Sequence, residues 1–188
     1  MNVIEAILSR TSRPRLCDPG PDDDALGMLF RCAGRAPDHG LLRPWRFVVF
    51  RGEARHALGE ILAGAEQVAN PAATADSLAK IRGNPLRAPV VVACVACVDP
   101  GHPKVPRVEQ VSAVAAAVQN MQLAAEALGF GAMWRTGPLA ASPLVKQSLG
   151  FDEVDEIVAF LYLGTPEGDR RAAPAIDPAV FVREWGRP

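Results

Sequence analysis

The chain has 188 residues, 49% of them hydrophobic, which fits a single domain over residues 1–188 with a substantial core. Its 20 basic and 21 acidic residues give a net charge of -1, so neither a nucleic acid nor an anionic membrane surface is an expected partner. No apolar run reaches the roughly 18–20 residues that span a bilayer, and the N-terminus lacks the pattern of a signal peptide. We therefore expect a cytoplasmic protein.

The N-terminal third of the chain predicts helices and one strand. Apolar residues at helical spacing predict an amphipathic helix over residues 2–10. Residues 22–24 are three aspartates that supply the N-cap and acidic first turn of a second helix, which ends before Pro37. Residues 45–50 have the pattern of a strand, and residues 53–68 that of a helix with a weak apolar face.

The middle of the chain contains the two most apolar elements. Residues 70–84 predict a short helix or a lid, since they are rich in small side chains. Residues 89–98 are a continuous β-branched run, typical of a central strand buried on both faces. Residues 108–128 predict a helix that is apolar around nearly its whole circumference and is therefore buried on all sides. In a domain of this size, such burial indicates coverage by a second subunit.

The C-terminal third predicts two strands around a short helix. Residues 132–134 and 155–163 have strand patterns. Ser142 as N-cap and Pro143 at the first helical position predict a helix that reaches Leu149. A polar, proline-rich tail then ends in an apolar cluster, which we expect to dock on the core or on a partner. The cluster comprises Val180, Phe181, Val182 and Trp185.

Residues 35–45, with the sequence RAPDHGLLRPW, form the connection that stands out as a candidate site. Pro37 and Pro44 stiffen it, because each fixes φ and removes a backbone donor. Rigid loops that carry Arg, His and Asp between packed elements are common places for a site. The alternative is an ordinary helix-to-strand connection with solvated charges.

Several familiar sites are not supported. Cys94 and Cys97 have CxxC spacing, but they point to opposite faces of a strand, and no nearby histidine completes a zinc site, so we expect no metal. The sequence contains no GxSxG, HExxH or Walker motif. The glycines of residues 129–131 follow a helix rather than a strand, which argues against a dinucleotide fingerprint.

Cationic and hydroxyl side chains instead recur where predicted elements end. They are Arg10 and Ser12, Arg35 and His39, and Arg135 and Thr136. Guanidinium groups match phosphate oxygens bidentately, so this set favours a phosphate-bearing ligand. Solvated surface arginines are the alternative.

Taken together, these segments resemble the FMN-dependent nitroreductase family, and most closely its compact YdjA-like branch. The resemblance extends over nearly the full chain in the same order. It is carried by SRTS at residues 9–12, RAPDH at 35–39, PW at 44–45, RAP at 87–89, KVPR at 104–107, EQ at 109–110, GFG at 129–131, WRTG at 134–137 and FLYLGTP at 160–166.

The resemblance implies an α+β fold with a mostly antiparallel central sheet flanked by helices, in an intertwined homodimer with a long central helix. It also implies one FMN per site at the subunit interface. The FMN phosphate and ribityl chain would be held by Arg10, Thr11 and Ser12, with Arg135 as a second phosphate ligand. Trp134 and Thr136 would complete that side of the FMN pocket.

Two further segments acquire roles from the resemblance. Arg35 and His39 would reach the flavin from the other subunit. The end of the long helix would contact NADH or NADPH through Ala124, Ala125, Glu126, Ala127, Leu128 and Gly129. The chain departs from the family pattern at Thr11, where a second basic residue is common, and at Val108, where an aromatic residue is common.

The implied chemistry is ping-pong electron transfer from NAD(P)H through FMN to nitroaromatic, quinone or similar acceptors. The flavin carries the reaction, while the protein supplies orientation and charge. Arg35 is the candidate for stabilising the reduced anionic flavin, and His39 is the one plausible general acid. The alternative function is a flavin- or nucleotide-binding dimer without turnover, such as a storage or sensory module.

Overall fold

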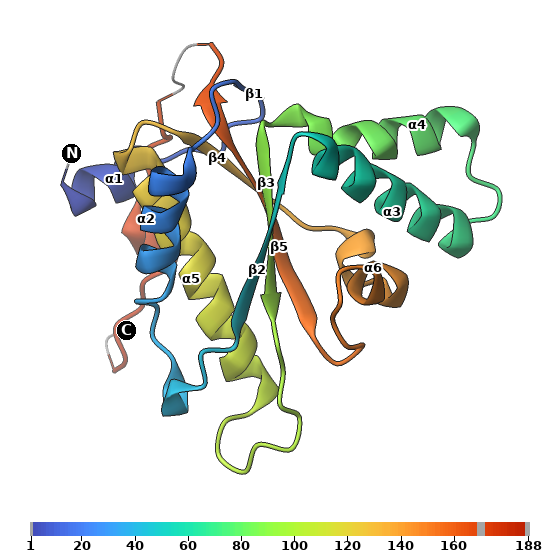
Figure 1. Cartoon of the computed structure of the whole chain (residues 1–188). Helices are drawn as coiled ribbons and strands as arrows, with labels where there is room; N and C mark the ends of the chain where they lie inside the picture. Colours follow the sequence, from blue (N-terminus) through green and yellow to red (C-terminus); the bar gives the residue numbers. More distant parts are fainter. Residues whose placement is uncertain (1, 169–171, 187–188) are drawn as a thin grey trace.

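The computed structural model describes residues 2–168 and 172–186. It is an α+β structure in which helices cover both faces of an antiparallel sheet (Figure 1). The strands are β1 (Leu16–Cys17), β2 (Trp45–Arg51), β3 (Val90–Ala96), β4 (Gly131–Arg135) and β5 (Glu156–Pro166). The α-helices are α1 (Val3–Ser9), α2 (Asp23–Ala33), α3 (Glu53–Ala69), α4 (Ala75–Gly83), α5 (Arg107–Ala127) and α6 (Pro143–Ser148). Short 3-10 turns are η1 (His39–Leu41), η2 (Asn84–Arg87), η3 (Pro138–Ala141) and η4 (Pro178–Val180).

The sheet has the order β1-β5-β3-β2, and β4 also pairs with β5. Every pairing is antiparallel, which confirms the mostly antiparallel sheet. All seven residues of β3 are buried, as its continuous β-branched sequence predicts. Because successive strand residues face opposite sides, Val92 and Cys94 pack under α2 and α5, whereas Val91 and Ala93 pack with α3 and α6.

Helix α2 forms as its sequence predicts. Asp22 is its N-cap, and the Asp22 carboxylate accepts a hydrogen bond of 2.9 Å from the Ala25 N–H. Leu29 and Ala33 are fully buried against the sheet. Helix α6 also forms, but the Ser142 side chain makes no capping hydrogen bond, so its first turn is set by Pro143 at N1 rather than by the serine hydroxyl.

The short helix predicted within residues 70–84 is present as α4. Helix α4 packs against α3, with Leu78 buried. The two helices approach closely at Gly59, where a Cβ atom would lie 2.3 Å from the Arg82 carbonyl oxygen. Arg82 also donates a hydrogen bond of 2.9 Å to Glu60.

Helix α1 is present, but its apolar face is not buried in the single chain. Asn2 and Glu5 form a capping box at its N-terminus, and Ala6 is its one buried residue. The apolar face that the sequence predicts is exposed, with Val3 at 64%, Ile4 at 60%, Ile7 at 48% and Leu8 at 71%. The helical spacing of apolar residues therefore predicted the helix correctly, but it did not show which surface buries the apolar face.

Helix α5 likewise differs from the expected helix buried on all sides. One flank is buried under the sheet and α2, including Val114, Val118 and Met121. Val108 and Leu128, near its two ends, are 67% and 45% exposed. The reason is that, among the described residues, no element covers one flank of this alanine-rich helix, so coverage by a second subunit stays a prediction.

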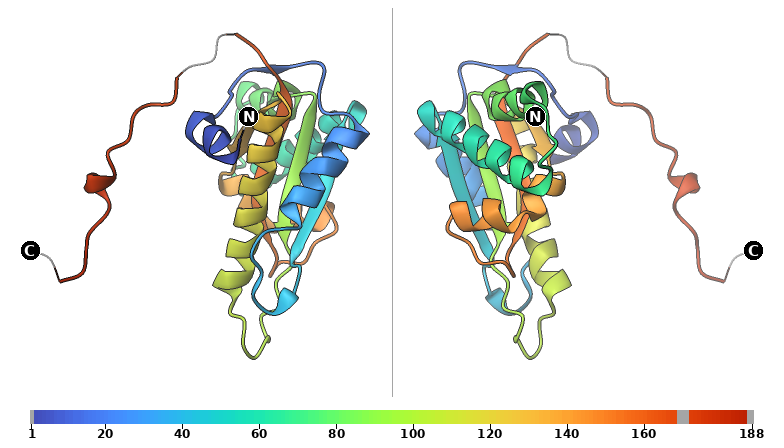
Figure 2. Two further views of the ribbon diagram at one scale, coloured as in Figure 1. Left: turned by 90° about the vertical axis from the view of Figure 1, so that its left-hand side faces the viewer. Right: turned by 90° about the vertical axis from the view of Figure 1, so that its right-hand side faces the viewer.

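The C-terminal tail extends away from the body of the protein (Figure 2). The four residues of its apolar cluster are exposed, and Trp185 is 99% accessible. Docking on the chain's own core is therefore not observed, and docking on a partner stays a prediction. Among the described residues, no helix is both long enough and apolar enough to cross a membrane.

Candidate functional site

The loop after α1 is held against the start of β4. The Arg13 N–H donates a hydrogen bond of 3.0 Å to the Ala132 carbonyl. Gly131 makes this approach sterically feasible, because a Cβ atom there would lie 2.6 Å from Leu16 and 3.0 Å from Arg13. The basic run that follows Arg10 is thus placed beside the sheet by backbone contacts.

A pocket of about 650 Å³ lies between this loop and the segment that follows β5. Its lining is formed by Thr11, Ser12, Arg13, Pro14, Arg15, Glu167, Gly168, Ala172 and Pro174. Two of its side-chain atoms, Thr11 Oγ1 and Arg13 Nε, are buried and have no hydrogen-bond partner within the described part of the chain. Buried polar atoms in folded proteins are nearly always paired, so these two atoms point to a hydrogen-bonding ligand.

The chemistry of this pocket fits the ribityl phosphate of FMN. The guanidinium groups of Arg13 and Arg15 match phosphate oxygens. The hydroxyls of Thr11 and Ser12 can donate or accept, and the Glu167 carboxylate can accept from ribityl hydroxyls. Of the residues that line this pocket, Thr11 and Ser12 are predicted from the sequence as FMN ligands, whereas Arg13, Arg15 and Glu167 are not. The two arginines belong to the same basic run as Arg10, and this run is the sequence feature that could have identified them.

Arg10, Trp134, Arg135 and Thr136 are not among the residues that line this pocket. Arg10 is the C-cap of α1. The Trp134 indole N–H donates to the Val158 carbonyl at 3.2 Å, and Thr136 is exposed just after β4. Arg135 ends β4, four residues beyond Gly131, which at ~3.3 Å per residue is about 13 Å along the strand.

Arg135 stacks on a buried tyrosine. Its guanidinium carbon lies 5.6 Å from the centroid of the Tyr162 ring, within the range of a cation–π contact. Burial raises the pKa of Tyr162, although the nearby positive charges of Arg135 and Arg87 act in the opposite direction. The ring therefore stays a neutral phenol beneath the guanidinium at physiological pH.

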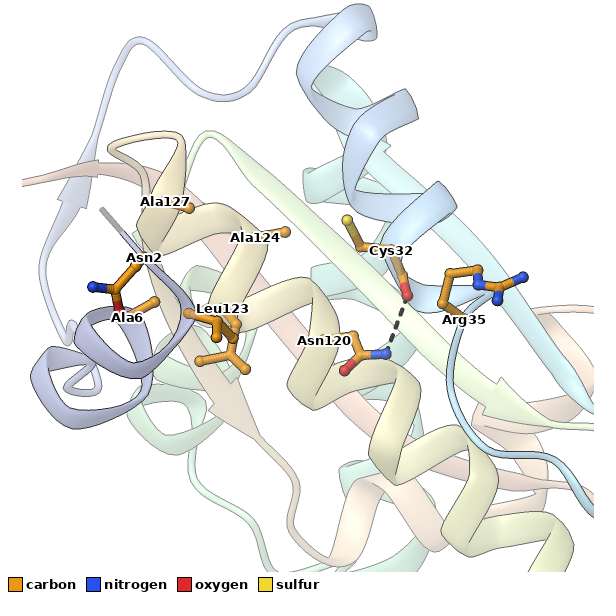
Figure 3. Close-up of a pocket in the computed structure, with 9 residues that line it drawn as sticks. Asn2, Ala6, Cys32, Arg35, Asn120, Leu123, Ala124 and Ala127 are labelled. Carbon is orange, nitrogen blue, oxygen red and sulfur yellow. Dashed lines mark hydrogen bonds between the residues drawn. The ribbon is translucent and has the colours of Figure 1, made fainter.

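A second pocket, of about 430 Å³, is formed by α1, α2 and α5 (Figure 3). It is lined by Asn2, Val3, Ala6, Cys32, Arg35, Asn120, Leu123, Ala124 and Ala127. Asn120 joins two of these helices, since its side-chain amide donates to the Cys32 carbonyl at 3.1 Å (Figure 3). Three residues predicted for flavin or nicotinamide contact thus share one pocket: Arg35, Ala124 and Ala127.

The rest of the predicted nicotinamide segment forms the end of α5 and its cap. The Ala125 side chain is fully buried in the core, so it faces away from any ligand. Glu126 is half-buried, Leu128 is exposed, and Gly129 adopts the left-handed conformation, φ 85°, of a helix C-cap.

His39 lies in η1 and contacts the first turn of α5. Its Nδ1 atom lies 2.6 Å from Glu109 Oε2. The surrounding loop is strained, because Leu41 and Arg43 have positive φ angles of 54° and 49°. The Asp38 carboxylate braces it by accepting from the Arg43 N–H at 2.6 Å. The predicted stiffness of residues 35–45 thus comes from side-chain bracing as well as from proline.

The predicted site residues therefore occupy separate places on one chain. Thr11 and Ser12 line the first pocket, Arg35 lies in the second, and His39 is on η1. Within residues 2–168 and 172–186, no cluster of His, Cys, Asp and Glu suits a metal ion.

The fold and the first pocket define a class: a small α+β protein with a cationic, hydroxyl-bearing pocket suited to a phosphate ester. The model of the nitroreductase family matches residues 9–165. The chain belongs to this family.

Two relatives match it along nearly their whole length. A protein of Escherichia coli (strain K12) named "Putative NAD(P)H nitroreductase YdjA" is 42% identical over 186 residues, which cover 97% of this chain and 98% of that protein. A protein of Haemophilus influenzae with the name "Putative NAD(P)H nitroreductase" is 33% identical, with coverage of 97% and 98%.

Solved structures share the fold. A nitroreductase-like family protein from Bacillus cereus has a TM-score of 0.83 at 24% identity, covering 100% of this chain and 97% of its own. A "putative nitroreductase in complex with FMN" from Desulfovibrio desulfuricans has a TM-score of 0.74 at 25% identity, with coverage of 100% and 99%.

Proposed function

We propose that the protein is an FMN-dependent oxidoreductase that takes electrons from NADH or NADPH and acts as a homodimer. One observation carries the proposal: within residues 2–168 and 172–186, the buried atoms Thr11 Oγ1 and Arg13 Nε have no hydrogen-bond partner, and the other side chains of their pocket suit a ribityl phosphate. The FMN named for the Desulfovibrio structure and the NAD(P)H in the names of the relatives support the same cofactors here.

In this proposal, FMN extends from the first pocket along β4. Thr11, Ser12, Arg13 and Arg15 bind the phosphate and ribityl chain. Arg135 lies about 13 Å farther along the strand than Gly131, so it meets the ring end of the cofactor rather than the phosphate. Trp134, whose indole N–H is fixed by its hydrogen bond to the Val158 carbonyl, keeps this part of β4 rigid.

The second subunit would complete the site. Arg35 and His39 are exposed and lie outside the first pocket of their own chain. The exposed apolar face of α1 and the uncovered flank of α5 would be buried by dimer formation. We place Arg35 near the pyrimidine part of the ring, where its positive charge stabilises negative charge.

When bound, FMN supplies the two-electron chemistry that connects a nicotinamide to a nitroaromatic or quinone acceptor. The chain's residues bind and orient the cofactor, and Ala124 and Ala127 offer small side chains that leave room for a nicotinamide in the second pocket.

The absorption spectrum of the purified protein tests the proposal. We expect a yellow protein that releases FMN on denaturation and whose flavin absorbance bleaches when NADH or NADPH is mixed with it in a stopped-flow instrument. A colourless protein that does not take up added FMN would refute it. Retention of FMN without bleaching by either nucleotide would favour a binding module without turnover.

A further inference from the structure

We propose that Glu109 is a positioning residue, which fixes the imidazole of His39 so that its Nε2 atom is presented to the flavin site of a second copy of the chain. This inference rests on the proposed function, in which His39 reaches across the dimer interface. It concerns a residue that contacts no cofactor itself and acts through the histidine.

The contact between the two side chains determines which ring nitrogen is left for a ligand. The Nδ1 atom of His39 lies 2.6 Å from Glu109 Oε2, a short distance typical of a charge-assisted hydrogen bond. Because a carboxylate can only accept, Nδ1 carries the proton and donates. Nε2, on the opposite side of the ring, is then the nitrogen that can meet a ligand.

The pair adds little to the stability of the chain. The two side chains are 59% and 46% exposed, and ion pairs between exposed groups contribute little to folding stability. A short contact between exposed groups is therefore better explained by orientation of the imidazole than by stabilisation of the fold.

The loop that carries His39 is held in one strained shape. Gly40, Leu41 and Arg43 all have positive φ angles, and two of them are not glycine. Such conformations persist only where the surroundings over-determine them, and they cluster at functional positions. The loop therefore offers His39 few alternative orientations.

The surface against which this loop packs is also fixed. A Cβ atom on Gly40 would lie 3.3 Å from the Val105 side chain, so the loop packs closely on that side chain. Val105 is buried, its N–H donates to His102 Nδ1 at 2.9 Å, and its carbonyl accepts from Gln110 at 2.9 Å. Glu109 precedes Gln110 in the first turn of α5, so its carboxylate projects from a rigid base.

The experiment is a double-mutant cycle on full-length protein, with FMN affinity read from the quenching of flavin fluorescence as apoprotein is added. We expect Glu109→Ala to weaken FMN binding about fivefold, the effect of one hydrogen bond, and to have no further effect in a His39→Ala background. Glu60→Ala is the matched control, since it removes a surface ion pair with Arg82 on the opposite side of the sheet. It should leave FMN affinity unchanged.

Two outcomes would overturn the inference while the proposed function stands: wild-type FMN affinity in Glu109→Ala, or an equal loss in both backgrounds. The ¹⁵N spectrum of His39 in the wild-type protein gives an independent reading, which needs no variant to fold. A proton resident on Nδ1 supports the pair, and a proton on Nε2 alone refutes it. Failure of wild-type apoprotein to bind FMN would instead count against the proposed function.

Discussion

Replacing Arg13 tests the cofactor pocket most directly, because the structure predicts a small effect on the stability of the apoprotein and a large effect on FMN binding. Arg13 Nε is buried and has no hydrogen-bond partner among the described residues. A buried polar group left unsatisfied costs about 1–3 kcal/mol. Arg13→Ala removes that cost, although it also removes the packing of the side-chain stem near Gly131. The two terms are of similar size, so the free energy of unfolding of the apoprotein should change by less than about 1 kcal/mol.

The complex should respond very differently. A hydrogen bond to a charged group is worth about 1.5–3 kcal/mol, so the variant should bind FMN roughly 10- to 150-fold more weakly. Urea unfolding of the apoprotein and titration with FMN measure the two quantities. Arg51→Ala is the matched control, because Arg51 pairs with Asp23 on the surface at 2.7 Å and lines neither pocket. Unchanged FMN affinity in Arg13→Ala would refute the pocket as the phosphate site.

Three further predictions follow from individual contacts. Thr11→Val removes the other unpaired atom of the pocket, so it should stabilise the apoprotein by about 1 kcal/mol in urea unfolding and weaken FMN binding; lower apoprotein stability would contradict this. Gly59→Ala should destabilise by about 1–3 kcal/mol, since its Cβ would meet the Arg82 carbonyl at 2.3 Å, whereas Gly64→Ala, on the same helix with open space, should stabilise by about 0.5–1 kcal/mol; similar effects of both would show that α3 and α4 do not pack as described. Burial raises the pKa of Tyr162, so the unfolded chain releases that proton first, and stability should fall as pH rises above the ordinary tyrosine value of 10. Tyr162→Phe should flatten this part of the pH profile, and an equally steep decline in the variant would exclude Tyr162 as its source.

The sequence by itself determined the elements and the family. The β-branched run of β3, the aspartate cap of α2 and the long alanine-rich stretch of α5 each specify local structure through a strong periodicity or cap. Short motifs in a fixed order were sufficient to identify the resemblance to nitroreductases, which the family match over residues 9–165 confirms. These signals are local, and they can be read without knowing which surfaces meet.

Only the tertiary structure decided which surfaces meet and which polar atoms lack partners. The apolar face of α1 predicts a buried helix, yet burial depends on a neighbour that the single chain does not supply. Arg13 lines the first pocket because Gly131 lets the loop lie against β4, a contact between residues far apart in sequence. The same is true of His39 and Glu109, which are 70 residues apart and meet only because η1 packs against the start of α5. Long-range contacts of this kind leave no periodic pattern in the sequence. Sequence patterns therefore identify the chemical groups, while the fold determines which groups they contact.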